Sequence, residues 1–357
     1  MEKRHYFKKG VTALLFNVCV CLAVATVTGF NAYAVAGGGA VLNLLNRGIP
    51  GGAAGMAIQK ELWMNSIVEG LFADNTFLAK AYSADMFVNA GKTVHIPNAG
   101  SPSGVAKNRT SKPATASART DSELTFNLDE FTTDPIYIPN ADTVELSYNK
   151  RESVLKTDKA ALQEAVANAF LYYWAPASPL IATVGATEDT AYLPSATGAR
   201  HNLTKKAFLD AMTKFNGDNI PQEGRYVLLD AVMYSQLLAD LTANESQAFH
   251  AGIDVKNGVV GKLYTFNIMV RSQALRYTSA GTAKEWTAAG AATDCAGALA
   301  WHVDSVCRAL GEVKAFENEG DPQWYGDIYS FLVRCGGAKM RSDGKGLLAI
   351  VQGTPAG

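Results

Sequence analysis

Histidine and cysteine, the residues that most often act as metal ligands or catalytic groups, are few and widely spaced in this chain of 357 residues. The histidines are His5, His95, His201, His250 and His302. The cysteines are Cys19, Cys21, Cys295, Cys307 and Cys335. They show neither the CxxC nor the HExxH spacing of a zinc site, and an odd number of distant cysteines makes no disulfide framework. We therefore predict no metal and no cofactor, and we expect the cysteines to be small buried hydrophobic residues.

Acidic pairs such as Asp129-Glu130 and Glu317/Glu319 could supply a general acid and a general base. Solvated charge is the commoner role of such pairs, and His302 is typical of a partly buried helix residue, so none is assigned a catalytic role. Residues 100–104 have the outline of a nucleophile elbow, but a proline stands at the centre and no strand–turn–helix pattern surrounds it. No GxxxxGK[ST] phosphate loop and no DxDxDG calcium loop occurs. We predict that the protein is not an enzyme and has no small-molecule substrate, with an unrecognised hydrolase as the enzyme alternative.

One polar segment, residues 98–121, carries only positive charges before Asp121 and has no large apolar residue except Val105. Its four basic residues are Lys107, Arg109, Lys112 and Arg119. No acidic residue precedes Asp121 in this segment, and an insertion of this length is either functional or disordered. It is a solvated loop or an arm that reaches another chain. We expect its charges to meet acidic partners on a neighbouring subunit, because paired charges at a rim give register and specificity.

The composition excludes several classes of protein. Hydrophobic residues make up 48% of the chain and charged residues 18%, whereas about 25% charged is usual. This apolar content excludes a disordered chain, and a net charge of -1 gives no support to nucleic-acid binding by bulk charge. Because interface cores are depleted in charge, the low proportion of charged residues indicates that other protein covers much of the surface.

The N-terminal segment, residues 1–36, resembles a secretory signal. Lys3, Arg4, Lys8 and Lys9 precede an almost unbroken apolar run, Val11–Thr28, and a small-x-small site follows at Ala32–Ala34. The alternative is an apolar arm that packs on a neighbouring subunit. The first interpretation predicts a secreted or envelope-anchored protein, and the second an assembly of several copies.

The patterns predict an α+β chain without a regular βαβ series. An arm and helix are expected over residues 37–82, and peripheral strands over 83–150, including strands at 91–97, 124–128, 136–138 and 144–148. These strands flank the extended loop at about 98–121. A lobe is expected over residues 177–338, and a returning peripheral strand with the tail over 339–357.

A long helix is predicted over residues 151–176, with Ser153 or Thr157 as its cap and Pro176 as its end. Its packing face comprises Leu155, Leu162, Val166, Phe170 and Tyr173, at spacings typical of a helix.

Within the lobe, a helix is predicted at 204–215, a strand at 226–229, and a helix capped by Asp230. Asn257-Gly258 predicts a hairpin turn. Residues 299–310 favour a short helix, although a strand is the alternative, and strands are predicted at 328–333 and 347–351.

Four stretches resemble the major capsid protein family of tailed bacteriophages, which has the Hong Kong 97-type fold. GKTVHIPN (91–98) resembles the strand that enters the extended loop, and residues 129–174 resemble the returning strands and the spine helix. Residues 224–241 with 257–272 resemble the central lobe, and residues 298–351 resemble the C-terminal portion. The resemblance covers about residues 60–352, and it depends on patterns of apolar and turn residues.

The resemblance implies a Hong Kong 97-like capsid fold with an N-terminal arm, an extended β-loop, a spine helix, a peripheral sheet and a central α/β lobe. It implies a shell protein that forms hexamers and pentamers around packaged double-stranded DNA, without sequence-specific binding. A portal and a scaffold or maturation protease would be its partners, and the location would be the virion capsid, assembled in the bacterial host cytoplasm. The alternatives are the secreted or envelope-anchored binding protein and an encapsulin-type compartment shell.

Overall fold

The computed structural model describes residues 64–68, 70–71, 75–89, 92–98, 107–110, 122–139, 150–321, 323–341 and 343–354. The chain divides into two units, residues 1–65 and 66–357, and all elements discussed below belong to the second. The predicted N-terminal segment 1–36 and the predicted strand at 144–148 lie outside the described residues. Within the predicted arm and helix, residues 66–68 and 70–71 are helical, and Ile67 and Leu71 are buried.

The long helix α5 spans Lys150–Trp174. The residues of its predicted packing face, Leu155, Leu162, Val166 and Phe170, are buried, and Tyr173 is half-buried. The predicted caps are wrong, because the helix begins before both Ser153 and Thr157. It ends two residues before Pro176, as expected from the restriction that a proline places on the preceding residue.

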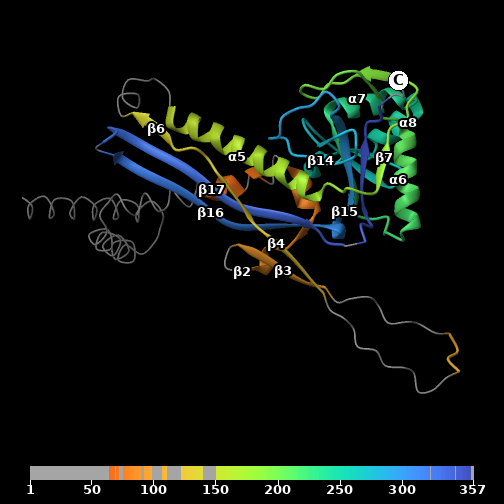
Figure 1. Ribbon diagram of the computed structural model, residues 1–357, viewed down its shortest axis with the longest axis horizontal. Helices are drawn as coiled ribbons and strands as arrows, with labels where there is room; N and C mark the ends of the chain where they lie inside the picture. Colours follow the sequence, from red (N-terminus) through yellow and green to blue (C-terminus); the bar gives the residue numbers. More distant parts are fainter. Residues whose placement is uncertain are drawn as a thin grey trace, which may run out of the picture. The chain divides into compact units, whose positions relative to one another are not determined.

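Helix α5 runs along one face of the hairpin formed by β16 (Val306–Asp321) and β17 (Gly326–Lys339), as Figure 1 shows. A glycine makes this close approach possible. A Cβ atom at Gly337 would lie 2.9 Å from ring atoms of both Phe170 and Trp174, which is closer than a side-chain carbon can approach. Any larger residue here would therefore push the helix away from the sheet.

Strands from distant parts of the chain complete a five-stranded sheet around this hairpin. β1 (Tyr82–Ser83) runs parallel to β16, with Tyr82 opposite Cys307. β5 (Asp129–Thr132) and β6 (Ile136–Pro139) run antiparallel to β17. β16 and β17 therefore form the centre of this peripheral sheet, and short strands form its edges.

A separate three-stranded sheet carries the two ends of the predicted extended loop. Its strands are β2 (Val88–Asn89), β3 (Thr93–Asn98) and β4 (Ser122–Asn127). On β3, Val94 and Ile96 are buried and His95 is exposed, as their alternation predicts. His95 Nδ1 lies 2.6 Å from Glu123 on the paired strand β4.

The lobe is built on an eight-stranded mixed sheet, in which β15 (Cys295–His302) is central. The other strands are β7 (Leu180–Ala182), β10 (Arg225–Asp230), β11 (Val259–Leu263), β12 (Phe266–Arg271), β13 (Leu275–Tyr277), β14 (Ala283–Lys284) and β18 (Leu347–Val351). The helices of the lobe are α6 (Lys205–Gly217), α7 (Ala231–Asp240) and α8 (Ala243–His250), and β8 (Glu188–Thr190) pairs with β9 (Ala199–His201). The described residues also form the 3-10 helices η1 (Thr76–Lys80), η2 (Asp85–Phe87), η3 (Val255–Asn257) and η4 (Val303–Ser305).

The core of the lobe lies between this sheet and α6 and α7, with Phe208, Phe215, Met233 and Leu237 fully buried. The predicted cap of α7 is confirmed, since the side chain of Asp230 accepts a hydrogen bond from the Met233 N–H at 2.7 Å.

Three further sequence predictions differ from the structure. Residues 299–310, predicted as a short helix, form the end of β15, η4 and the start of β16, because β15 is buried on both faces and its apolar run mimics a helical period. His302 is accordingly a strand residue, with Nε2 2.9 Å from the Glu223 carbonyl oxygen. The predicted hairpin turn at Asn257-Gly258 instead closes η3, and the β11–β12 hairpin turns at Tyr264-Thr265.

The third difference concerns which sheet the C-terminal strands join. β18 pairs with β15 and β7 in the lobe, whereas the sequence placed it in the peripheral sheet. Conversely, β16 and β17, which fell within the predicted lobe at 177–338, form the peripheral sheet. The alternation of apolar and polar residues predicts a strand but not the strand with which it pairs. The sheet that each of these strands joins is therefore decided by tertiary pairing.

Trp174, the last residue of α5, contacts both of the larger sheets. Its side chain is fully buried, and its indole N–H donates a 2.9 Å hydrogen bond to the Cys307 carbonyl of β16. Its ring lies 6.2 Å from that of Trp301 on β15 and meets that of Phe77 edge-on at 5.8 Å. One side chain thus links the helix, the peripheral sheet and the lobe.

Candidate functional site

The predicted contact residues of the extended loop are only partly described. Lys107 and Arg109 are exposed, whereas Lys112 and Arg119 lie outside the described residues. The other predicted set, on the packing face of α5, is buried in the core except for Tyr173. Tyr173 lines a cleft formed by residues of α5, β5 and the segment 284–290.

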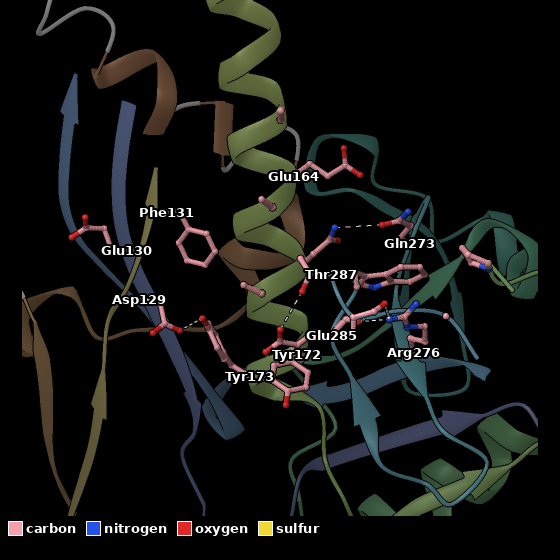
Figure 2. Close-up of a pocket in the computed structure, with 18 residues that line it drawn as sticks. Asp129, Glu130, Phe131, Glu164, Tyr172, Tyr173, Gln273, Arg276, Glu285 and Thr287 are labelled. Atoms are coloured by element: carbon pink, nitrogen blue, oxygen red, sulfur yellow. Dashed lines mark hydrogen bonds between the residues drawn. The ribbon is translucent and has the colours of Figure 1, made fainter. Parts of the chain in front are cut away.

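The cleft has a volume of about 790 Å³ and lies beside α5, with the helix as its floor (Figure 2). The floor is low because three alanines, Ala161, Ala165 and Ala169, recur at four-residue intervals and therefore lie on one face of the helix. Larger side chains border this stripe, among them Glu164 and Tyr172. A floor of methyl groups permits the backbone of another segment to approach the helix closely.

One wall of the cleft comes from β5. Tyr173 donates a hydrogen bond from its hydroxyl to the Asp129 carboxylate, and Figure 2 shows this contact between helix and strand. The next residue, Glu130, forms an ion pair with Arg334 of β17, with Nη2 and Oε2 2.7 Å apart. The predicted acidic pair Asp129-Glu130 therefore bonds to two different partners, which is the arrangement of neighbouring residues on a strand.

The opposite wall is the segment 284–290, which follows β14. The Trp286 indole donates a 3.0 Å hydrogen bond to the Ala274 carbonyl, and its ring lies 5.5 Å from the guanidinium of Arg276. Arg276 also donates to the carbonyls of Glu285 and Ala288. Because Arg276 is buried on β13, these bonds anchor the wall to the sheet.

A buried ionic cluster holds the end of this wall. The Asp294 side chain is fully buried, and its carboxylate lies 2.8 Å from Lys284 Nζ and 3.9 Å from Arg276 Nε. It also accepts a 3.0 Å hydrogen bond from the Ala291 N–H. Burial by itself would raise the pKa of Asp294, but the hydrogen bonds and the charges of Lys284 and Arg276 outweigh it and hold the pKa below its usual value.

We expect the Asp294→Asn variant to lose about 1–3 kcal/mol of unfolding free energy at neutral pH, because a buried cationic pair loses its counter-charge. A carboxylate with a depressed pKa stabilises the fold fully above its unfolded pKa of about 3.9, and this contribution is lost as the pH falls through the folded pKa. Urea unfolding of both proteins between neutral pH and acid should therefore show a difference that shrinks in the acid range. A difference that stays constant across this range would contradict the assigned role.

The cleft is negatively charged. Its carboxylates are those of Asp129, Glu130, Glu164 and Glu285, against the single guanidinium of Arg276 among its lining residues. Glu164 and Glu285 are exposed, and neither forms an ion pair with another described residue. Burial, the hydrogen bond to Asp129 and nearby negative charges, including that of Glu285, raise the pKa of Tyr173 well above its usual value. Tyr173 therefore remains a neutral hydrogen-bond donor, and Glu164 and Glu285 are exposed carboxylates of the cleft.

The described residues contain no group of three or more histidine, cysteine or acidic residues placed to hold a metal ion. Cys295, Cys307 and Cys335 are free thiols buried as predicted, and burial raises the pKa of Cys307 to about 11. Among the helices of the described part of the chain, none has the length and apolarity needed to cross a bilayer.

The cleft could not be predicted from the sequence, because its floor at 161–173 and its walls at 129–131 and 273–290 come from separate stretches of the chain. The signal that was available is the alanine stripe: Ala161, Ala165 and Ala169 interrupt the outer face of a helix whose other face is apolar. A stripe of small residues on its own does not identify a site; the cleft is defined only together with the walls that the folded chain places beside the stripe.

Comparisons with known proteins identify the fold. No family model matches the chain, and no curated protein sequence matches it. Its structure is similar to one from Mycobacterium phage Che8, with 15% identity and a TM-score of 0.51, covering 77% of this chain and 90% of that one. It is also similar to the capsid of Cyanophage P-SCSP1u, with 16% identity and a TM-score of 0.52, covering 76% and 86%. The capsid of Ralstonia phage GP4 matches with 12% identity and a TM-score of 0.52, covering 77% and 87%.

These likenesses concern the fold. The chain has an α+β fold of the kind found in phage capsid structures, which confirms the predicted Hong Kong 97-type fold class.

Proposed function

We propose that this chain is a major capsid protein, which self-assembles into the icosahedral head that encloses the DNA of a phage or prophage and carries out no chemistry of its own. The observation that supports this proposal is the shared fold, which extends over 86–90% of the phage chains compared. A shell subunit needs surfaces that bind other copies of itself. Such surfaces are depleted in charged residues, and only 18% of the residues of this chain are charged.

The parts of the fold take corresponding roles in this proposal. α5 is the spine, the sheet of β16 and β17 is the peripheral domain, and the lobe built on β15 surrounds the five-fold and six-fold axes. The segment at about 98–121 extends over a neighbouring subunit, where its basic residues meet acidic ones. The partners are other copies of the chain, a portal, and a scaffold or maturation protease, and packaged double-stranded DNA is enclosed without sequence-specific binding. The site of action is the virion capsid, assembled in the bacterial host cytoplasm.

Electron microscopy of the purified protein tests this function. Protein expressed from Met1 and, in parallel, from Met56 should give closed shells or capsomer rings in negative stain. Light scattering of the same samples should show particles of the corresponding size. Shells from the shorter chain would in addition show that the apolar residues 1–36 are dispensable for assembly. A soluble monomer from both, with the longer chain cleaved after Ala34, would overturn the proposal in favour of a secreted binding protein.

A further inference from the structure

We infer that the cleft beside α5 binds a linear aliphatic polyamine. Its ammonium groups would bind Glu164 and Glu285, and its methylene chain would lie on the alanine stripe of α5 between them. The inference is independent of the proposed function, because it requires one folded subunit and no assembly. It assigns to the cleft a class of ligand that is cationic, unbranched and apolar between its charges.

Most polar side chains of the cleft have their hydrogen bonds within the protein. The two carboxylates of β5 bond to side chains of α5 and β17, and Arg276 bonds to the carbonyls of the opposite wall. The Asn168 side chain donates to Gln273 at 3.4 Å and accepts from Arg271. These groups hold the walls in place, and a ligand gains little from them, because each new bond would replace one already made.

Glu164 and Glu285 are different, because neither forms an ion pair with another described residue. Glu285 accepts one hydrogen bond, from the Thr287 hydroxyl at 3.2 Å. An ionised carboxylate can only accept hydrogen bonds, and its two oxygens have about four acceptor sites. The ligand group that suits such a site is therefore a positively charged donor. An ammonium group donates hydrogen bonds and accepts none, and its bonds to a carboxylate are of the strong, charge-assisted kind.

The two carboxylates lie at different positions along α5. Glu164 belongs to the helix, whereas Glu285 lies near Tyr173, since its charge helps to raise the pKa of that tyrosine. Figure 2 shows Glu285 on the wall beside α5, where Thr287 bonds to its carboxylate. Glu164 and Tyr173 are nine positions apart, which is about 13 Å along a helix. One ammonium group cannot reach both carboxylates, whereas a chain with an amine at each end can.

The floor between these positions suits the methylene chain of such a ligand. Ala165 and Ala169 lie between Glu164 and Tyr173 on the face of α5 that lines the cleft. Their side chains are methyl groups, so an unbranched aliphatic chain can approach the helix closely and bury apolar surface there. Carboxylates at both ends of an apolar floor thus match amines at both ends of an apolar chain.

Aromatic rings at the edge of the cleft are suited to the same ligand. Trp286 already has a cation near its ring, since the Arg276 guanidinium lies 5.5 Å from the ring centre. Tyr172 is half-buried beside Tyr173, with ring centres 6.4 Å apart. The face of an aromatic ring attracts an ammonium group, and more strongly where water is partly excluded. The rings therefore add to the attraction that the carboxylates exert.

Isothermal titration calorimetry with spermine tests the inference on the full chain. The titration uses purified protein at low salt, after light scattering has shown that the sample is free of particles. We expect saturable binding of one spermine per subunit, and weaker binding at higher salt, because exposed charges are screened. n-Butylamine, which has a single amine, should show no saturable binding at the same concentrations. Absence of saturable spermine binding would overturn the inference.

A pair of charge variants assigns the binding to the cleft. Glu164→Gln with Glu285→Gln keeps the shape of the cleft and removes both charges, and we expect the Kd of spermine to rise about tenfold or more. Glu223→Gln with Asp304→Asn is the matched control, because it removes two exposed acids outside the cleft, and it should leave the Kd unchanged. An equal loss of binding in both double variants would show a general attraction to net charge and overturn the inference.

Ala165→Leu tests the floor without a change in charge. Leucine is a good helix former and Ala165 is exposed, so circular dichroism should show the fold retained. The larger side chain would occupy the place of the methylene chain, and we expect spermine binding to weaken as much as in the double glutamine variant. Ala160→Leu, at an exposed position of the same helix outside the cleft, is the control and should bind spermine normally. Binding that survives Ala165→Leu would mean that the polyamine does not lie on the stripe, and the inference would be wrong.

Discussion

Replacing Trp174 by alanine should lower the free energy of unfolding by about 3–5 kcal/mol, the range typical of a fully buried large aromatic side chain. The loss has two causes. The cavity would remove the ring contacts with Phe77, Phe170 and Trp301, and the Cys307 carbonyl would lose the indole N–H that satisfies it. Urea unfolding followed by far-ultraviolet circular dichroism would measure the change.

The Trp174→Phe variant is the matched control. It keeps most of the apolar volume but lacks the indole N–H, so it should lose only part of the stability, about 1–3 kcal/mol for the unsatisfied buried carbonyl and the smaller ring. An alanine variant as stable as the phenylalanine variant would show that Trp174 does not hold the helix to the two sheets.

The second large effect is expected from Ala165→Pro, at about 3 kcal/mol or more of unfolding free energy. Ala165 lies in the middle of α5 and its side chain is exposed, so the substitution acts through the backbone. Proline removes the N–H that bonds to the Ala161 carbonyl, and its ring clashes with that carbonyl. A kink here would lift Phe170 and Trp174 from Gly337 and the sheet below. Thermal unfolding of the purified subunit measures the effect.

Ala165→Gly separates helix propensity from helix breakage. Glycine keeps the hydrogen bond and should cost about 1 kcal/mol in an exposed helix interior. Equal stabilities of the proline and glycine variants would mean that this part of α5 is not held as a continuous helix, and the assigned spine would then be wrong.

The helices were the part of this fold most open to prediction from the sequence. α5 has buried residues at Leu155, Leu162, Val166 and Phe170, and these spacings of seven, four and four residues over about four turns are typical of one face of a helix. Asp230 before α7 likewise indicated a cap that the structure contains. In both cases the information is local, because a helix satisfies its hydrogen bonds within one segment.

The strands show why the rest could not be predicted. All eight residues of β15 are buried, so the strand lacks the alternation that identifies a half-exposed strand, and Leu299, Val303, Val306 and Leu310 fit a helical spacing by chance. β18 was identified as a strand with its bounds correct, yet it joined the other sheet. Partner choice is decided by packing between segments far apart in the chain, and one sequence does not contain that information in readable form.

The cleft combines both situations. Its floor is a local pattern, the alanine stripe on α5, whereas its walls at β5 and 284–290 meet the helix only in the folded chain. The four carboxylates of the cleft come from three separate stretches of the sequence, at 129–130, 164 and 285, so they form no run of acidic residues that the sequence alone would show. The basic segment at 98–121 could be identified from the sequence because its charged residues before Asp121 are all positive and lie within one stretch.

The pairing of the peripheral sheet also governs when the subunit can fold during its synthesis. Asp85 accepts a hydrogen bond from the Leu310 N–H across 225 positions of sequence, next to the point where β1 pairs with β16. The edge strands β1, β5 and β6 and the helix α5 leave the ribosome long before their central partners β16 and β17. Contacts at such sequence separation form slowly, because loop closure must precede any gain from pairing. The chain therefore completes its peripheral sheet only after β16 and β17 have been synthesised, and a chain terminated before them lacks the surface on which β5 and α5 are held in place.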